Sequence, residues 1–164
     1  MRKTITFILI LALILSLSTT AYAADSTQNN SLIPPIDEIS PNKDLAQGSI
    51  HIIQPAAATG GILEASNQLR NAGNGILLCS SNTRTNGQAD QISVSYQVQR
   101  YTGTDWTFVG DGSTTGYKTS NYSGSISKSV SLGYYYRLVT YHYSYIGGNL
   151  VSSCSVTSTS IYVG

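Results

Sequence analysis

From residue 62 to the end of the chain, hydrophobic and polar residues alternate with a period of two. The clearest stretch, residues 92–99, has only Ile, Val and Tyr on one side and only Ser and Gln on the other. Such a segment suits an antiparallel sheet that packs on a core with one face and is solvated on the other. The pattern therefore predicts a β-rich domain with polar outer surfaces.

Turn residues divide this region into about seven short strands, the number expected of an immunoglobulin-like sandwich. The breaks fall at the Asn-, Gly- and Asp-containing segments 71–75, 86–90, 102–105 and 147–149. The expected strands span residues 62–69, 76–83, 92–99, 106–109, 134–146 and 150–163, with weaker strands around 116–118 and 125–132. Because no helical period accompanies them, we expect residues 58–164 to form one all-β, antiparallel sandwich domain.

The first 23 residues have the pattern of a cleavable signal peptide. Arg2 and Lys3 precede an apolar run over residues 5–17, and Ala21 and Ala23 supply the small residues of a cleavage site. The alternative is an uncleaved membrane anchor, but the run is shorter than the roughly 20 residues that a transmembrane helix needs. We expect the chain to be secreted and, after cleavage, to have no membrane segment.

Residues 24–57 have the composition of a flexible linker. They contain all four prolines of the chain and a polar run over residues 25–31. Few apolar residues are available to offset the entropy of ordering such a segment. Its short apolar stretch 50–53 could still dock on the domain.

Charge narrows the range of partners. The chain carries a net charge of +1, which becomes −1 once Arg2 and Lys3 leave with the signal peptide. Nucleic-acid binding requires a basic patch, and a polybasic membrane-surface role requires one too. Neither kind of partner is therefore expected.

The two cysteines, Cys79 and Cys154, predict one disulfide, because an even number of cysteines in an exported chain usually pairs. The bridge would close a long loop and stabilise the fold by roughly 4 kcal/mol. The alternative is two buried free thiols. The choice depends on whether the two Cα atoms lie within about 7 Å of each other.

The domain offers few groups for catalysis. Its acids are Glu64, Asp90, Asp105 and Asp111, and its one histidine is His142. Asp105 and Asp111 flank one expected strand, but both lie in turn sequences, where Asp commonly caps the backbone. No nucleophile elbow, phosphate-binding loop or set of metal ligands is present. We expect a protein without enzymatic activity, metal or cofactor, and a small hydrolase remains the least favoured alternative.

Several segments resemble the second half of a fibronectin type III domain. They are Tyr-Gln-Val-Gln-Arg-Tyr at 96–101 with Gly103 and Trp106, then Leu-Gly-Tyr-Tyr-Tyr-Arg-Leu-Val at 132–139, and the pair 147–148. The chain also resembles a family of small secreted proteins from Gram-positive bacteria that has no assigned function. The resemblance covers roughly residues 72–164 and lacks the usual core Trp of the second strand. It implies a fibronectin type III-like or immunoglobulin-like sandwich.

The resemblance also implies which side chains of residues 134–146 face the core. Tyr134, Tyr136, Leu138 and Thr140 would point inward, and either Tyr134 or Tyr136 would donate its hydroxyl to upstream backbone in a tyrosine corner. The opposite side would carry Tyr135, Arg137, Val139, Tyr141, Tyr143 and Tyr145. An error of one residue in phase would exchange the two sets.

This tyrosine-rich side is the strongest candidate for function. The candidate binding residues are Tyr135, Tyr141, Tyr143 and Tyr145, with Tyr101 and Trp106 nearby. Flat aromatic patches stack on sugar rings or on apolar protein surfaces; the alternative role is cross-strand packing that stiffens the sheet. We expect a secreted binding or adhesion module that contacts glycan, cell wall or an extracellular protein. A structural, matrix-type protein without a specific ligand is the second hypothesis.

Overall fold

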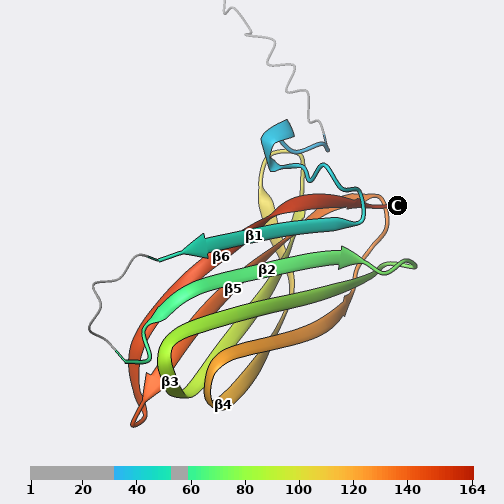
Figure 1. Cartoon of the computed structure of the whole chain (residues 1–164). Helices are drawn as coiled ribbons and strands as arrows, with labels where there is room; N and C mark the ends of the chain where they lie inside the picture. Colours follow the sequence, from blue (N-terminus) through green and yellow to red (C-terminus); the bar gives the residue numbers. More distant parts are fainter. Residues whose placement is uncertain (1–31, 53–58) are drawn as a thin grey trace, which may run out of the picture.

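The computed structural model describes residues 32–52 and 59–164 and shows a single all-β domain (Figure 1). Its elements are the 3₁₀ turn η1 (Ile36–Glu38) and the strands β1 (Leu45–His51), β2 (Ile62–Asn71), β3 (Ile76–Tyr101), β4 (Trp106–Ser129), β5 (Tyr134–Ile146) and β6 (Asn149–Val163). All strand pairs are antiparallel, in the order β1-β2-β3-β5-β6, with β4 paired to β3. The predicted all-β class is confirmed.

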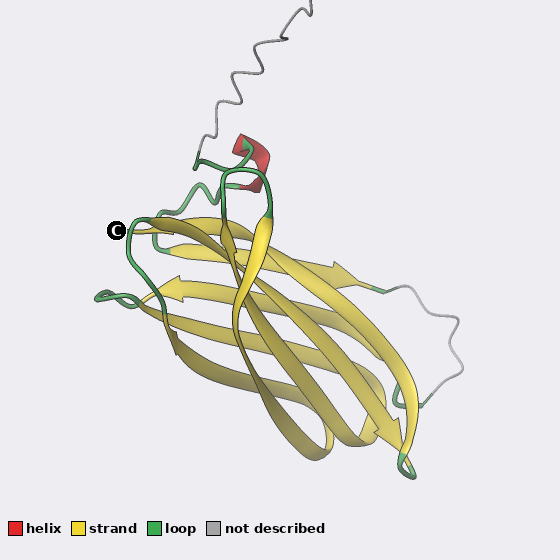
Figure 2. Ribbon diagram, turned by 180° about the vertical axis from the view of Figure 1, so that it is seen from behind, coloured by secondary structure: helices red, strands yellow, loops and turns green. Residues whose placement is uncertain are grey.

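Strands β3 and β4 are long, and they bend so that each belongs to two layers (Figures 1 and 2). The pairing of β3 with β4 shifts between Arg84 and Ala89, where Gly87 has a positive φ of 77°. Before the bend β3 pairs with β2, and after it β3 pairs with β5. The first layer is therefore β1-β2-β3-β4, and the second layer is β4-β3-β5-β6.

Two boundaries differ from the sequence prediction. Residues 86–90 form a bend inside β3, and the expected short strands at 106–109 and 116–118, with residues 125–129 of the third, are parts of one strand, β4. The two halves of β4 face each other at the margin of the sandwich, where a Cβ on Gly112 would come within 2.8 Å of Ile126. Because small residues fill this narrow margin, β4 shows little hydrophobic alternation in the sequence.

The linker prediction for residues 24–57 is wrong over residues 45–51, which form edge strand β1 paired along β2. An edge strand needs little apolar surface, and Ala46 is its one fully buried side chain. Gly48 lets β1 approach β6 closely, because a Cβ there would collide with the carbonyl oxygen of Thr157. The predicted signal peptide, residues 24–31 and residues 53–58 lie outside the described residues.

The interior is apolar at one end and polar at its centre. The larger apolar cluster comprises Ala46, Leu69, Leu77, Cys79, Val94, Tyr96, Val98, Tyr136, Leu138, Ile161 and Val163. A smaller cluster of Ile62, Ala65 and Val156 lies apart from it. Buried polar side chains include Asn67, Thr83, Thr140 and His142. They must pair with one another, since burial without a hydrogen bond is costly.

His142 is the centre of that polar network and joins the two layers. Its Nδ1 lies 2.7 Å from the hydroxyl of Thr83 on β3, and its Nε2 lies 2.8 Å from the hydroxyl of Thr140 on β5. Asn67 on β2 donates to the hydroxyl of Thr140 at 3.1 Å and to the carbonyl of Val156 on β6 at 2.9 Å. Burial lowers the pKa of His142 to about 4, so the imidazole is neutral near pH 7.

The predicted disulfide is wrong, because both cysteines are free. Cys79 lies in β3 of the first layer and packs in the larger apolar cluster. Cys154 lies in β6 of the second layer, opposite His142, and packs against the smaller cluster. Burial raises the pKa of Cys79 to about 12 and that of Cys154 to about 11, so both thiols stay protonated at neutral pH.

Candidate functional site

The outer surface of the second layer, which we call the tyrosine face, carries the tyrosines of β5. The inward side chains of this strand are Tyr136, Leu138, Thr140, His142 and Ser144, all buried. Tyr135, Tyr141, Tyr143 and Tyr145 point the other way and are half-buried. The predicted phase of β5 is confirmed. The hydroxyl of Tyr136 donates to the carbonyl of Ser131 at 2.7 Å, which is the predicted tyrosine corner.

Tyr141 and Tyr143 lie two residues apart on β5 and together line an open depression. Its other walls are Ser153, Cys154 and Ser155 of β6. On the opposite flank, β3 places Ser95 beside Tyr141 and Ser93 beside Tyr143. The two rings are thus bordered by hydroxyl groups on both sides. A surface of this kind can stack on a ring while it hydrogen-bonds the ring's substituents.

Tyr135 lies toward one end of this face, where its ring packs on Tyr162 of β6 at 5.3 Å between centroids. Tyr162 is 49% exposed and adds an accessible ring that the sequence prediction left out. The alternation of the terminal Ile-Tyr-Val segment was the available signal, because it places Tyr162 opposite to the buried Ile161 and Val163.

Trp106 and Tyr101 belong to a separate, internally satisfied cluster. Tyr101 is only 8% exposed, and its ring lies 5.2 Å from that of Trp106. The indole Nε1 of Trp106 donates to Glu38 at 2.9 Å, and the guanidinium of Arg137 stacks 4.4 Å above the indole ring. These contacts occupy both residues, so the structure does not bring them together with Tyr141 and Tyr143 as one platform.

Glu38 belongs to a short N-terminal strap, residues 36–40, that lies along β6. Ile39 forms a parallel bridge with Ser160, and the Ser160 hydroxyl donates to the carbonyl of Glu38 at 2.8 Å. The Glu38 carboxylate also lies 3.6 Å from Arg137. Desolvation lowers the pKa of Arg137, and its proximity to Glu38 opposes this. The strap therefore covers one end of the tyrosine face and leaves its middle open.

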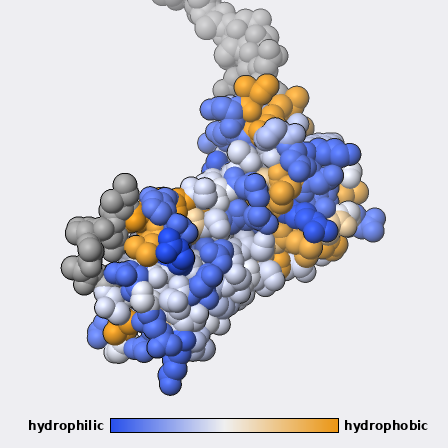
Figure 3. Space-filling view, viewed as in Figure 1, coloured by the Kyte–Doolittle hydropathy of each residue, from blue (hydrophilic) through white to orange (hydrophobic). Residues whose placement is uncertain are grey.

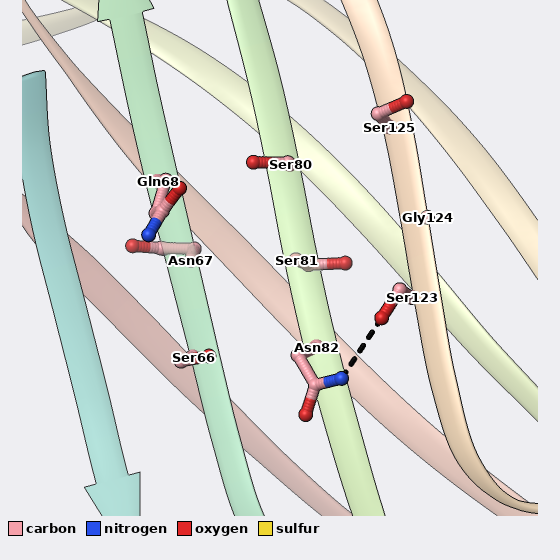
Figure 4. A pocket seen from close by; sticks show the side chains of 9 residues that line it. All are labelled: Ser66, Asn67, Gln68, Ser80, Ser81, Asn82, Ser123, Gly124 and Ser125. Atoms are coloured by element: carbon pink, nitrogen blue, oxygen red, sulfur yellow. Dashed lines mark hydrogen bonds between the residues drawn. The ribbon is translucent and has the colours of Figure 1, made fainter.

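The outer surface of the first layer contains a second depression, of about 400 Å³, that the sequence prediction missed (Figure 4). It continues into a neighbouring depression between β1 and β2. We call the combined feature the serine trough. Its outward-facing side chains are Gln47 and Ser49 of β1, Ser66 and Gln68 of β2, Ser80 and Asn82 of β3, and Ser123 and Ser125 of β4.

Uncharged polar side chains, five of them serines, line up across the four strands of the trough. Strand pairing aligns Ser49 with Ser66, Asn82 and Ser123, and it aligns Gln47 with Gln68, Ser80 and Ser125. Longer side chains stand at both margins, with Arg84 and Glu64 at one and Arg70 and Leu78 at the other. In Figure 3 the residues across the middle of this face are pale or blue, and orange residues lie toward its ends.

The groups considered for hydrolysis are not assembled into a catalytic site. His142 is fully buried within the polar network, away from solvent. Asp105 lies in the hairpin turn after Tyr101, whereas Asp111 faces outward on β4 beside Gln97. Asp90 accepts a hydrogen bond from the backbone N–H of Gly147 at 2.6 Å, so it holds the β5–β6 turn. Over residues 32–52 and 59–164, no three His, Cys, Asp or Glu residues are grouped as metal ligands.

A comparison with protein-family models finds no family that matches the chain, and a comparison with curated proteins finds no match. Within the part of the chain that the structure describes, no helix has the length and apolar character needed to cross a bilayer.

Proposed function

We propose that this chain is a secreted, non-catalytic binding module that holds a neutral extracellular glycan, such as a cell-wall polysaccharide, on its tyrosine face. The observation that carries the proposal is the pair Tyr141 and Tyr143, which lie side by side in an open depression bordered by serine hydroxyls. The signal-peptide pattern and the resemblance to small secreted Gram-positive proteins support an extracellular site of action.

The chemistry of this face favours a neutral sugar over a charged ligand. The residues next to the two rings are Ser93, Ser95, Ser153 and Ser155, none of which carries a charge. Aromatic rings supply apolar area at small entropic cost, and hydroxyls supply donors and acceptors that sugar hydroxyls can match. An ionic ligand would find no opposite charge beside the rings.

The test is retention of the purified protein on insoluble neutral polysaccharide and on purified cell walls. We expect Tyr141→Ala with Tyr143→Ala to weaken retention by roughly tenfold to hundredfold, equivalent to about 1.4 to 2.8 kcal/mol. The matched control is Phe108→Ala with Tyr117→Ala, which removes two exposed rings from β4 of the same layer. Unchanged retention of the Tyr141/Tyr143 variant would show that this pair is not the site.

A structural, matrix-type role is the second candidate, favoured by the free edge of β4. Among the described strands, β4 (Trp106–Ser129) pairs with β3 alone, so its other edge is not paired within residues 32–52 and 59–164 and is available to another chain. A matrix-type role predicts that the purified protein forms oligomers whose size increases with protein concentration. A strictly monomeric protein in sedimentation equilibrium at high concentration would argue against it.

A further inference from the structure

The serine trough has unused hydrogen-bonding capacity on a surface built from four strands. The side chains of Ser49, Ser66, Gln68, Ser80 and Ser125 form no hydrogen bond with any part of the chain that the structure describes. Asn82 is the exception, because its amide donates to Asn121 and to Ser123, both at 2.9 Å (Figure 4). Hydroxyls and amides of both donor and acceptor type are therefore presented to whatever occupies the trough.

Beneath the trough, the side chain of Asn67 points toward the second layer and is 1% exposed. Its amide donates to the carbonyls of Leu138 and Val156 and to the hydroxyl of Thr140. Its Oδ1, which has no hydrogen bond within the described chain, lies on the side of β6, because a Cβ on Gly48 that would collide with Thr157 would also lie 3.0 Å from it. The hydrogen bonds that β2 can offer in the trough therefore come from the outward-facing Ser66 and Gln68.

Charge argues for an uncharged occupant. None of the eight outward-facing trough residues is ionisable. At one margin Arg84 donates twice to Glu64, at 3.0 and 2.7 Å, and His51 lies 3.1 Å from the same carboxylate. These groups neutralise one another. Arg70, at the other margin, stands outside the trough.

The shape suits a linear chain that runs across the strands. Neighbouring strands lie about 4.8 Å apart, so four strands span roughly 14 Å between their axes. That length accommodates a few linked sugar rings. The aligned polar rows repeat once per strand, and no aromatic side chain lines the trough. Binding would rest on many hydrogen bonds rather than on stacking, so long ligands should bind better than short ones.

We propose that the serine trough is a second binding site for a neutral, polyhydroxylated chain, that is, a neutral polysaccharide. The site is separate from the tyrosine face and does not depend on it. If the proposed function of the tyrosine face also holds, one domain binds two polysaccharide chains on opposite surfaces and links them.

The experiment is a titration of the ¹⁵N-labelled protein with soluble neutral β-glucan and α-glucan oligosaccharides of increasing length, followed by amide chemical shifts. We expect at least one series to shift residues 66–68, 80–82 and 123–125, with at least tenfold tighter binding for hexasaccharides than for disaccharides. Ser66→Lys with Ser80→Lys should fill the trough and weaken these shifts at least tenfold. The control, Thr107→Lys with Ser127→Lys, adds the same charge at exposed positions outside the trough.

The Tyr141→Ala/Tyr143→Ala variant separates the two sites. We expect it to lose shifts on the tyrosine face and keep those in the trough; loss of tyrosine-face binding alone therefore leaves the trough proposal standing. Absence of trough shifts with every oligosaccharide at millimolar concentration would overturn the proposal. Two other results would also overturn it. Trough shifts that appear only with an unstructured peptide probe would indicate a peptide ligand, and trough shifts that appear only as protein concentration rises would indicate binding of a second copy of the chain.

Discussion

The two outer faces of this sandwich are made by the same alternation of side chains but differ in chemistry. On the second layer, Tyr141 and Tyr143 of β5 lie on the outer surface, and serines of β3 and β6 flank their rings. On the first layer, the corresponding positions of β2 and β3 carry Ser66 and Ser80, and the surface is hollow instead of aromatic. One face offers apolar area, and the other offers only hydrogen bonds. A domain with few charged residues can thus present two distinct recognition surfaces.

The largest expected effect comes from acid, which acts on the link between the two layers. Because burial disfavours the imidazolium, His142 has a folded-state pKa of about 4, below the value near 6.5 expected in the unfolded chain. The contribution of the neutral imidazole to stability is fully present above pH 6.5 and is lost as pH falls from 6.5 through 4. The free energy of unfolding decreases by about 3 kcal/mol at most over this range. The thiol of Cys154 opposite stays neutral over this range, since its pKa is raised.

Urea unfolding at pH 7.5 and at pH 4 measures this loss. We expect His142→Gln to remove most of the difference between the two pH values. Binding by both faces should weaken together in acid. A pH dependence that is the same in His142→Gln and in the parent protein would contradict this account of the link.

A substitution in β1 should loosen the packing of this edge strand on β6 of the second layer. A Cβ at Gly48 would collide with the carbonyl oxygen of Thr157 and lie 3.0 Å from Asn67 Oδ1. We expect Gly48→Ala to reduce the free energy of unfolding by about 2 kcal/mol and to disturb the serine trough while the tyrosine face is retained. The control is Gly110→Ala, whose Cβ would meet only the side chain of Lys128, at 3.5 Å. Equal stability of the two variants in urea would show that β1 and β6 are not closely packed.

The smallest expected effect concerns the second layer. Tyr136→Phe removes the hydroxyl that donates to Ser131 and should cost about 1 kcal/mol. Tyr135→Phe, on the outward side of the same strand, should leave stability unchanged. Amide shifts of the serine trough should be the same in both variants. A Tyr136→Phe protein as stable as the parent in urea would show that the tyrosine corner contributes little here.

The sequence predicted the tyrosine face better than the serine trough for a physical reason. The phase of β5 follows from local alternation within one strand. The family resemblance limited the tyrosine corner to Tyr134 or Tyr136, and the structure assigns it to Tyr136. The trough depends on the register of four strands, which aligns Ser49, Ser66 and Ser123 from distant parts of the chain. Each serine alone is an ordinary surface residue. The serines form a row only because the four strands pair in this register.

The errors have a similar origin. Cys79 and Cys154 are compatible with a disulfide by number and by the predicted compartment, yet their strands lie in different layers and their side chains in different clusters. Strand β1 was assigned to the linker because edge strands are held mainly by backbone hydrogen bonds, which leave little hydrophobic signal. Trp106 was placed with the tyrosines, but Glu38 and Arg137 occupy it. Long-range contacts decide all three cases.

The most direct measurement of the central claim is the response of the tyrosine ring protons to a neutral oligosaccharide, with residues assigned by single Tyr→Phe variants. Stacking of a sugar on the depression between β5 and β6 predicts that the ring signals of Tyr141 and Tyr143 shift and transfer saturation to sugar protons. The Tyr135 and Tyr162 rings, which pack on each other, should respond less. Ring signals of Tyr141 and Tyr143 that stay unchanged while the protein remains bound to the glycan would contradict the claim.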